Sequence, residues 1–369
     1  MSATITRRGC PVDALDVRTY RVPTADPFES DGTLTWKATT VVLVEIHAGG
    51  RTGIGYTYAD RAAASVIHDE LRERLEGADA LEIGRRFAEM QAAIRNMGRD
   101  GIASMAISAV DIALWDLKGK LLDVPVCTLL GAAREAVPVY GSGGFTSYTI
   151  DKLCEQLAGW VDAGIPRVKM KVGSDPSADV ERVARARGAI GDAELFVDAN
   201  GAYARKEALR FAREFARFDV RWFEEPVYHQ DFEGLRQIRE RAPAGMQVSA
   251  GEYGYGLYHF WRMLQAQTVD CLQADATRCG GFSGLLAVDG LCQGAMMPLS
   301  THCAPHLHLH VALACKTLRH SEYFYDHARI ERMFFDGTSD PIDGMLEPDL
   351  SRPGIGLELR RADAERYAE

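Results

Sequence analysis

The stretch between residues 168 and 302 most constrains the fold of this chain. Within it, short apolar runs recur, and each is followed by a side chain that can carry chemistry. Subtracting the positions of these side chains gives intervals of 27, 26, 28, 23 and 27 residues, close to the length of one strand, one helix and two loops. Reactive residues at the ends of successive strands are typical of a parallel (β/α) barrel. The six side chains are Lys171, Asp198, Glu224, Glu252, Asp275 and His302.

The same rhythm predicts a series of strands from residue 137 onward, with amphipathic helices between them. Parallel strands need such crossover helices, and right-handed crossovers close into a barrel. The predicted fold class is therefore α/β. We expect the strands at 137–140, 167–172, 194–198, 220–224, 247–251, 271–274, 297–301 and 322–325.

Segments outside this rhythm predict a second, smaller domain. Residues 12–58 alternate like antiparallel strands, interrupted at 21–35 by a long loop, and 101–122 carry the strongest helical pattern. A loop of this length is commonly functional or disordered. We expect the smaller domain over 1–132, the barrel over 133–336, and a tail over 337–369 that crosses back onto the smaller domain.

Composition narrows the classes of function. The formal charge of -10 and the lack of a basic run argue against nucleic acid as a partner. The eight cysteines show no C-x-x-C spacing, which is typical of reduced thiols inside a cell. No apolar run approaches the roughly 20 residues that span a bilayer, and the first residues show no signal-peptide pattern. We therefore expect a cytoplasmic protein that does not bind membranes.

Three acids close consecutive predicted strands, so a barrel brings Asp198, Glu224 and Glu252 to one side of its mouth. Three carboxylates held together are unfavourable unless a cation neutralises them. Oxygen ligands without Cys or His suit Mg²⁺, with Mn²⁺ as the alternative ion. Separate strand-end acids in water are the simpler interpretation, but three of them in register favour a metal site.

Two further groups suit proton transfer. Lys169 and Lys171 are two residues apart on one strand, so both face the barrel interior. Their mutual repulsion should lower the pKa of one of them and make it a usable base. Asp275 and His302 end neighbouring strands, and a carboxylate that holds one imidazole nitrogen creates a poised acid or base.

The histidines after the seventh strand invite a second metal interpretation. His306 and His310 share one face of a predicted helix, whereas His308 does not. A zinc site is therefore disfavoured on geometry. His306 remains a candidate for lining the substrate pocket.

Together these residues resemble the mandelate racemase subgroup of the enolase superfamily. The resemblance covers nearly the whole chain, including the helical signature AVDIALWDLKGK at 109–120, the segment 125–131, Lys169-x-Lys171 and Asp275-x-x-Arg278. It implies a modified (β/α)7β barrel of the TIM type, with an α+β capping domain made from the N-terminal part and the tail. It also implies a homo-oligomer, often an octamer.

The resemblance gives a role to each matching position. The implied Mg²⁺ ligands are Asp198, Glu224 and Glu252. The implied opposing acid/base groups are Lys171 and His302, the latter backed by Asp275. Lys169 would tune Lys171 and contact the substrate carboxylate, Glu322 would be an electrophilic acid, and Asn200 would neighbour the metal.

One departure bears on the reaction. Relatives that resemble muconate cycloisomerase carry a lysine base after the sixth strand, where this chain has Asp275 and Arg278. That difference disfavours the muconate-cycloisomerase branch. Arginine at position 278, where mandelate racemase itself has lysine, is common among acid-sugar dehydratases.

We therefore expect abstraction of the α-proton of a hydroxy-carboxylate through an enediolate, ending in dehydration of an acid sugar to a 2-keto-3-deoxy acid. Racemisation or epimerisation of a 2-hydroxy acid, cycloisomerisation of a sugar lactone and a non-catalytic binding role are the alternatives. Substrate contacts should come from the 21–35 loop and from neighbours of the strand ends. The candidates are Lys169, Asn200, Arg278, Ser142, Phe28, Trp36, Tyr56 and His306.

Overall fold

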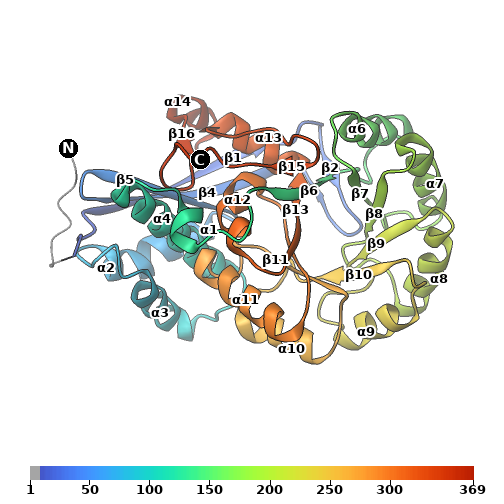
Figure 1. Ribbon diagram of the computed structural model, residues 1–369, viewed down its shortest axis with the longest axis horizontal. Coiled ribbons are helices and arrows are strands. Elements are labelled where there is room, and N and C mark those ends of the chain that lie inside the picture. The colour runs from blue at the N-terminus through green and yellow to red at the C-terminus, as the bar shows by residue number, and fades with distance from the viewer. Residues whose placement is uncertain (1–8) are drawn as a thin grey trace.

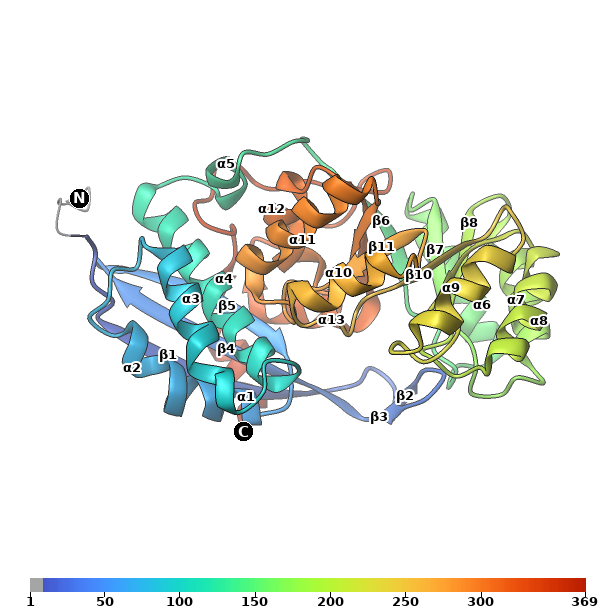
Figure 2. The ribbon, with the colours of Figure 1, turned by 90° about the horizontal axis from the view of Figure 1, so that it is seen from below.

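The computed structural model describes residues 9–369 and consists of a cap beside a barrel (Figure 1). The cap carries the N-terminal strands and the helices that follow them. The barrel begins at β6 and is ringed by helices, which Figure 2 shows from a second side. Within residues 9–369, no helix has both the length and the apolar character that crossing a membrane requires.

The barrel is a closed sheet of parallel strands in which β13 pairs back with β6. The α/β barrel predicted from the strand-end rhythm is therefore confirmed. The last strand begins at Leu318 rather than at 322, because Leu318 pairs with Leu299 of the neighbouring strand. The strands are β6 (Val137–Ser142), β7 (Arg167–Lys171), β8 (Glu194–Asp198), β9 (Val220–Glu224), β10 (Gln247–Ala250), β11 (Cys271–Ala274), β12 (Leu299–Thr301) and β13 (Leu318–Phe324).

Helices α6 to α12 each lead from one strand to the next. The helix after the last strand, α13 (Tyr325–Phe334), instead packs on the cap, where Phe334 contacts Tyr20 of the first strand edge to face. In a (β/α)7β barrel, each strand except the last is followed by a crossover helix, and this arrangement is the one found here. The crossovers are α6 (Ile150–Asp162), α7 (Asp179–Ile190), α8 (Arg205–Ala216), α9 (Phe232–Arg241), α10 (Leu257–Gln265), α11 (Gly281–Ala295) and α12 (Pro305–Ala314).

Alternation along the strands sends side chains to two different places. Val168 of β7 joins the large core between the sheet and its helices. Inside the barrel, Tyr140, Phe196, Trp222 and Cys271 form a separate buried cluster. Because side chains fill the interior, the carboxyl ends of the strands are left to hold chemical groups.

The cap is an antiparallel sheet covered by helices. Its strands β1 (Ala14–Pro23), β4 (Ala38–Ala48) and β5 (Arg51–Tyr58) lie in the order β1-β4-β5. Helix α4 (Ile102–Leu122) packs on β5, where Gly53 and Gly55 allow close approach because a Cβ at either position would overlap the helix backbone. The remaining elements are α1 (Ala62–Val66), η1 (Ile67–Leu71), α2 (Arg72–Leu75), α3 (Ile83–Ala93), η2 (Ile94–Asn96) and α5 (Val126–Leu130).

The C-terminal tail runs from the barrel back to the cap. Its strand β15 (Met345–Leu346) pairs with β6, while Asp116 of α4 accepts a hydrogen bond from the backbone N–H of Ile355 at 2.8 Å. At the end of the chain, the N–H of Glu369 donates to the carbonyl of Thr19 at 3.1 Å. The other tail elements are β14 (Phe335–Asp336), β16 (Glu358–Leu359), α14 (Arg361–Ala364) and η3 (Glu365–Tyr367).

The segment expected as a long loop, 21–35, contains a short hairpin of β2 (Glu29–Ser30) and β3 (Thr35–Trp36). Figure 2 shows this hairpin extending from the cap sheet toward the barrel. There the N–H of Thr146 donates to the carbonyl of Ser30 at 2.8 Å, and the two hydroxyls lie 2.7 Å apart. Contacts with a distant part of the chain order this segment, which its Pro and Gly content alone did not predict.

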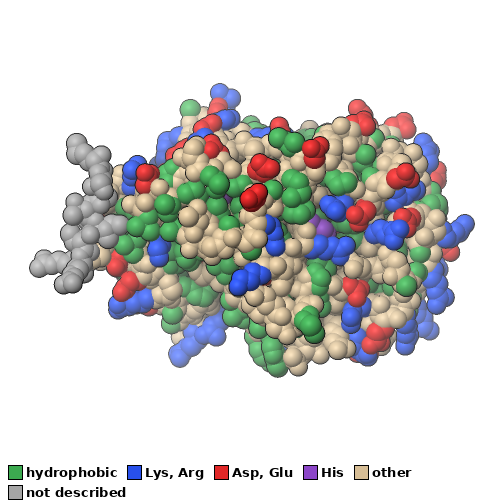
Figure 3. Space-filling model, viewed as in Figure 1, with side chains coloured by type: hydrophobic (Ala, Val, Ile, Leu, Met, Phe, Trp, Pro, Cys, Tyr) green, Lys and Arg blue, Asp and Glu red, His purple; other side chains and the backbone are tan. Residues whose placement is uncertain are grey.

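Surface charge is mixed. On the face in Figure 3, Lys and Arg side chains are interspersed with Asp and Glu. Each of the eight cysteines is a free thiol.

Candidate active site at the mouth of the barrel

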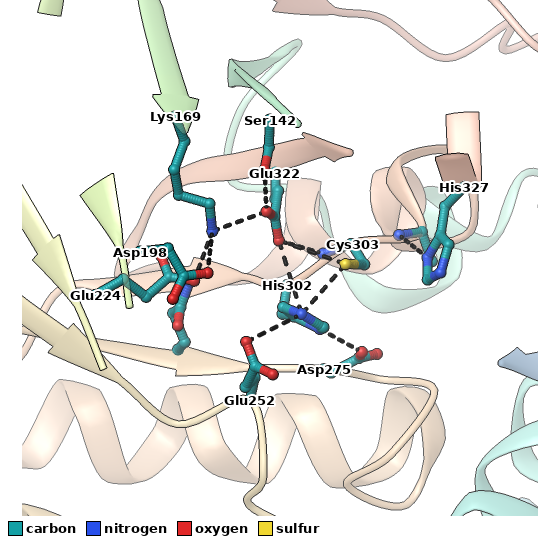
Figure 4. A network of polar contacts seen from close by, with 12 residues as sticks. Ser142, Lys169, Asp198, Glu224, Glu252, Asp275, His302, Cys303, Glu322 and His327 are labelled. Carbon is teal, nitrogen blue, oxygen red and sulfur yellow. Dashed lines mark hydrogen bonds and ion pairs between the residues drawn. The ribbon is translucent and has the colours of Figure 1, made fainter. Parts of the chain in front are cut away.

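The reactive side chains at the strand ends meet in one place (Figure 4). Parallel strands bring their carboxyl ends to the same edge of the sheet, so residues far apart in sequence become neighbours. All of them are buried. The group comprises Lys169 and Lys171 of β7, Asp198 of β8, Glu224 of β9, Glu252 after β10, Asp275 after β11, His302 after β12 and Glu322 of β13.

Asp198, Glu224 and Glu252 form a compact group of carboxylates. One oxygen from each lies within 4.8 Å of the others. Burial, reinforced by the charge of Asp198, raises the pKa of Glu224 to about 8. Glu252 Oε2 and Asn200 Oδ1 are two of the buried side-chain atoms that have no hydrogen-bond partner among the described residues. Clustered carboxylates with free lone pairs are the donor set that a hard divalent cation such as Mg²⁺ prefers, so these residues fit the ion.

The two lysines contact these carboxylates. Lys169 Nζ lies 2.5 Å from Glu224 Oε1 and 2.8 Å from Glu322 Oε1, and Lys171 Nζ lies 2.5 Å from Asp198 Oδ2. Burial lowers the pKa of each lysine, but the neighbouring carboxylates outweigh burial, and both pKa values are raised. The prediction that mutual repulsion leaves one lysine with a lowered pKa is therefore wrong for this arrangement. The carboxylates lie closer to each ammonium group than the sequence could show.

His302 is held by Asp275 as predicted from the adjacent strand ends. Its Nδ1 lies 2.8 Å from Asp275 Oδ2, and its Nε2 lies 3.3 Å from Glu252 Oε2. Burial lowers the pKa of His302, but surrounding acids, including Glu252 and Asp275, outweigh it and raise the pKa well above its ordinary value. The second oxygen of Asp275 accepts a hydrogen bond from the N–H of Thr277 at 2.7 Å. The carboxylate is thus fixed from two sides, and it fixes the imidazole ring.

Glu322 closes the group on the side of β13. Its Oε1 accepts a hydrogen bond from the Ser142 hydroxyl at 2.5 Å, and its Oε2 accepts one from the N–H of Cys303 at 2.9 Å. Burial raises the pKa of Glu322, but Lys169 outweighs burial and the pKa is lowered. In this arrangement Glu322 is an ionised hydrogen-bond acceptor, whereas the resemblance implied an acid.

A cavity of about 710 Å³ opens above these groups, between the cap and the barrel. The predicted residues Trp36, Asn200 and Arg278 line it. Arg278 also lies 3.6 Å from both Glu252 and Asp275. It therefore has a charge-balancing role that its position in the motif did not reveal.

Four predicted substrate contacts lie elsewhere. Phe28 directly precedes β2, is exposed and does not line the cavity, and Ser142 lies against Glu322. Tyr56 is buried in the cap, where its hydroxyl donates to Glu331 at 2.7 Å. His306 Nδ1 lies 2.7 Å from the same Glu331 and its Nε2 lies 2.8 Å from the carbonyl of Ser339. We correct our interpretation of Ser142, Tyr56 and His306, because their hydrogen bonds are used within the fold, whereas a substrate contact by Phe28 stays a prediction.

The cavity is also lined by residues that were not among the named candidates, and three of them are Tyr58, Cys303 and His327. Tyr58, the last residue of β5, stacks on His327 of α13, and both rings line the cavity. Cys303 also lines the cavity, and its thiol lies 3.2 Å from His302 Nε2. Burial raises the pKa of Cys303 to about 12, so this thiol is neutral. The position of Tyr58 at a strand end was an available signal, whereas no sequence pattern marked Cys303 or His327.

Glu29 lies in β2, inside the hairpin that lies against the barrel, and it is buried. Burial, reinforced by Asp326 and only partly offset by Arg329 and the Trp36 indole, raises the pKa of Glu29 to about 8. A carboxyl with a raised pKa in the folded state holds its proton more tightly there than in the unfolded chain. Its contribution to stability is therefore present in acid and is lost as the pH rises from about 4.5 to about 8.

Glu29→Gln is expected to stabilise the protein near pH 9 by roughly 1–3 kcal/mol and to change little near pH 5, because glutamine mimics the protonated acid without ionising. Urea unfolding of both proteins at the two pH values measures the difference. The control is Glu240→Gln, at an exposed position of α9, which should show no difference in stability between the two pH values. Equal stability of Glu29→Gln and the parent protein near pH 9 would contradict the assignment.

Comparison with known proteins places this arrangement in a family. Residues 14–131 match the N-terminal domain described as mandelate racemase / muconate lactonizing enzyme, and residues 152–364 match the enolase C-terminal domain-like family. The chain belongs to the mandelate racemase/muconate lactonizing enzyme family. The resemblance seen in the motifs is therefore confirmed, and the two matches fall on the cap and on the barrel with part of the tail.

Relatives in this family include enzymes that act on acid sugars. The chain is 35% identical to a 3,6-anhydro-alpha-L-galactonate cycloisomerase from Streptomyces coelicolor, covering 84% of this chain and 86% of that protein. It is 32% identical to the L-talarate/galactarate dehydratase of Salmonella typhimurium, covering 89% of this chain and 82% of that protein. A crystal structure of that dehydratase contains Mg and L-lyxarohydroxamate, and matches with a TM-score of 0.89 and 28% identity over 100% of this chain and 96% of that one.

A third match is a mandelate racemase/muconate lactonizing enzyme-like protein from Rubrobacter xylanophilus. Its crystal structure matches with a TM-score of 0.95 and 54% identity, covering 97% of this chain and 100% of that chain. The cap and barrel of this family member thus have a near-complete counterpart among solved structures.

Proposed function

We propose that this protein catalyses the Mg²⁺-dependent dehydration of an acid sugar to a 2-keto-3-deoxy acid. One observation carries the proposal. Within the carboxylate group, Lys171 contacts Asp198 and His302, held by Asp275, lies against Glu252, so a substrate anchored there would have two separate proton-transfer groups beside it. Removal of an α-proton and departure of a hydroxyl both need such groups.

The carboxylates Asp198, Glu224 and Glu252 would hold the ion. When bound, Mg²⁺ supplies positive charge that stabilises the enediolate, an effect worth several kcal/mol. Carboxylate oxygens that bind the cation would no longer form ion pairs with Lys169 and Lys171. The loss of its ion pair would favour the neutral, basic form of Lys171. Lys169 lies between Glu224 and Glu322 and would orient the carboxylate of the substrate.

Side chains of this protein carry out the proton transfers. Lys171 or His302 removes the α-proton, and the electron pair of that C–H bond forms the enediolate. The 3-hydroxyl then leaves as water with a proton from His302, and the resulting enol tautomerises to the 2-keto acid. Asp275 keeps the imidazole ring aligned through both steps.

The cavity supports a polyhydroxy substrate. Polar groups from both the cap and the barrel line it, including Asp31, Thr39, Asp60, Asn200 and Arg278. Each can bind a hydroxyl, and a site built from such groups rejects analogues that leave them unpaired. The names of the relatives, which are galactarate, talarate, arabinonate and rhamnonate dehydratases, agree with this substrate class.

Cycloisomerisation is the second candidate. It is favoured by two relatives, the anhydrogalactonate enzyme at 35% identity and a D-galactarolactone cycloisomerase of Agrobacterium fabrum at 33%. Both reactions can begin with the same proton abstraction. They differ in whether water is lost.

A screen of acid sugars and their lactones with Mg²⁺ separates the candidates. Dehydration is expected to give a semicarbazide-reactive product that is lighter than the substrate by one water in mass spectrometry. A product of unchanged mass would contradict dehydration and indicate cycloisomerisation or epimerisation. No product from any acid sugar, together with no Mg²⁺-dependent thermal shift, would contradict the enzymatic role itself.

A further inference from the structure

A second set of possible metal ligands lies beside the three carboxylates. His302, Cys303 and Glu322 offer a nitrogen, a sulfur and an oxygen, and all three side chains are buried (Figure 4). Cys303 Sγ lies 3.2 Å from His302 Nε2 and 3.5 Å from Glu322 Oε2, and the nitrogen and oxygen lie 3.9 Å apart. Of these three residues, Cys303 has no part in the dehydration described above.

The spacing of the three atoms suits one particular kind of ion. A triangle with these three sides has a circumradius of about 2.1 Å, close to the bonds of roughly 2.0–2.3 Å that Zn²⁺ makes to nitrogen, oxygen and sulfur. A cation near the centre of the triangle would therefore reach all three donors with little movement of any side chain. Imidazole and thiolate favour Zn²⁺ over Mg²⁺, whereas the neighbouring oxygen-only group favours Mg²⁺.

The surroundings of the three donors also resemble those of a built site. Asp275 binds His302 at Nδ1, which leaves Nε2 on the side of the triangle. A carboxylate behind a metal-binding histidine is the usual partner at zinc sites. Glu322 is held through its other oxygen by Lys169 and Ser142. The backbone after His302 is left-handed, with φ of 51° at Cys303, and this places the thiol beside the ring of the preceding residue.

We propose that His302, Cys303 and Glu322 form a second cation site that takes Zn²⁺ or another thiophilic divalent ion and inactivates the enzyme when filled. Binding releases two protons to solvent, one from the Cys303 thiol and one from His302 Nε2, and a His302 that is bound to the cation through Nε2 can no longer transfer a proton. His302 and Cys303 line the cavity, so an entering ion can reach them and a water can complete its ligands. Binding itself does not depend on which reaction the enzyme catalyses.

Cobalt reports directly on the thiolate. Wild-type protein saturated with Mg²⁺ is titrated with Co²⁺, and one equivalent is expected to produce a thiolate-to-Co²⁺ charge-transfer band that Zn²⁺ abolishes. Cys303→Ser should lose this band and bind Zn²⁺ about 100-fold more weakly or worse. The control is a Cys10→Ser/Cys154→Ser double variant, which removes the two partly exposed thiols and should keep the band.

X-ray absorption of Zn²⁺-loaded wild-type protein keeps the proposal testable if Cys303→Ser does not fold. One sulfur near 2.3 Å together with nitrogen or oxygen ligands near 2.0–2.1 Å is expected. A shell of oxygen alone would overturn the proposal, because the ion would then be in the carboxylate group. A band that survives in Cys303→Ser, or that disappears from the double variant, would overturn it as well.

Discussion

Glu224→Gln is expected to weaken Mg²⁺ binding by at least about 100-fold and to lower kcat/KM by about 10³-fold or more. The reason is electrostatic: Glu224 ends the middle one of three neighbouring strands that carry the carboxylates, and an amide cannot supply the negative charge that a carboxylate gives to a bound cation. A loss of several kcal/mol of charge stabilisation corresponds to about three powers of ten in rate. Calorimetric titration with Mg²⁺ and steady-state kinetics measure the two effects.

The matched control is Glu194→Gln. Glu194 begins β8 at the opposite end of the barrel, where it forms a partly exposed pair with Arg167. Exposed pairs of this kind are worth at most about 1 kcal/mol, so Mg²⁺ affinity should stay within a factor of about two. Unchanged Mg²⁺ affinity in folded Glu224→Gln would show that the three carboxylates are not the metal site.

Asp275→Asn is expected to lower kcat by about 10³–10⁴-fold while the protein stays folded, by analogy with the effect of the wrong histidine tautomer in serine proteases. The N–H of Thr277 donates to Asp275 Oδ1, so the oxygen of an asparagine would be used there and its NH₂ group would face His302. Because that NH₂ group donates a hydrogen bond, Nδ1 of His302 must accept it and cannot carry a proton. The proton then sits on Nε2, so His302 cannot take a proton from the substrate there, and without a carboxylate to stabilise the imidazolium it is also a poor proton donor to the leaving hydroxyl.

Asp111→Asn tests whether loss of any buried carboxyl has the same effect. Asp111 is buried in α4, and burial raises its pKa to about 7, although the hydroxyl and N–H of Ser283 both donate to it. It does not line the cavity. The asparagine oxygen can accept from the Ser283 N–H, and its NH₂ group can donate to the Ser283 hydroxyl, which then accepts, so kcat should change less than about threefold. A similar small change in Asp275→Asn would show that the pair with His302 does not act in catalysis.

Much of this site could be predicted because its residues recur at regular intervals along the chain. A strand-end residue recurs at a nearly constant interval, and a closed parallel barrel converts a constant interval into proximity. Asp198, Glu224 and Glu252 were placed together on that basis, and so was Asp275 beside His302. The packed interior of Tyr140, Phe196 and Trp222 could not be placed as a cluster, but it is the physical reason that the chemistry lies at the strand ends.

What the sequence could not show depends on distances between segments. The pKa values of Lys169 and Lys171 are decided by which charge is nearest, and the carboxylates are nearer than the sequence pattern could indicate. Tyr56 and Tyr58 share one face of a strand, and only the packing of α13 against the cap places one in the core and the other at the cavity. The hairpin at 21–35 is ordered by Thr146, a residue more than a hundred positions away.

Exchange of the substrate α-proton with D₂O tests the central claim most directly, namely that Lys171 and His302 are proton-transfer groups on opposite sides of one substrate. With Mg²⁺ present, wild-type protein should introduce deuterium at the α-carbon, as seen by NMR. Lys171→Ala and His302→Asn should both fail to complete turnover, and only one of these variants should retain the exchange. The base that abstracts the proton is the residue of the two that is still present in that variant. Exchange retained in both variants, or turnover without Mg²⁺, would contradict the account.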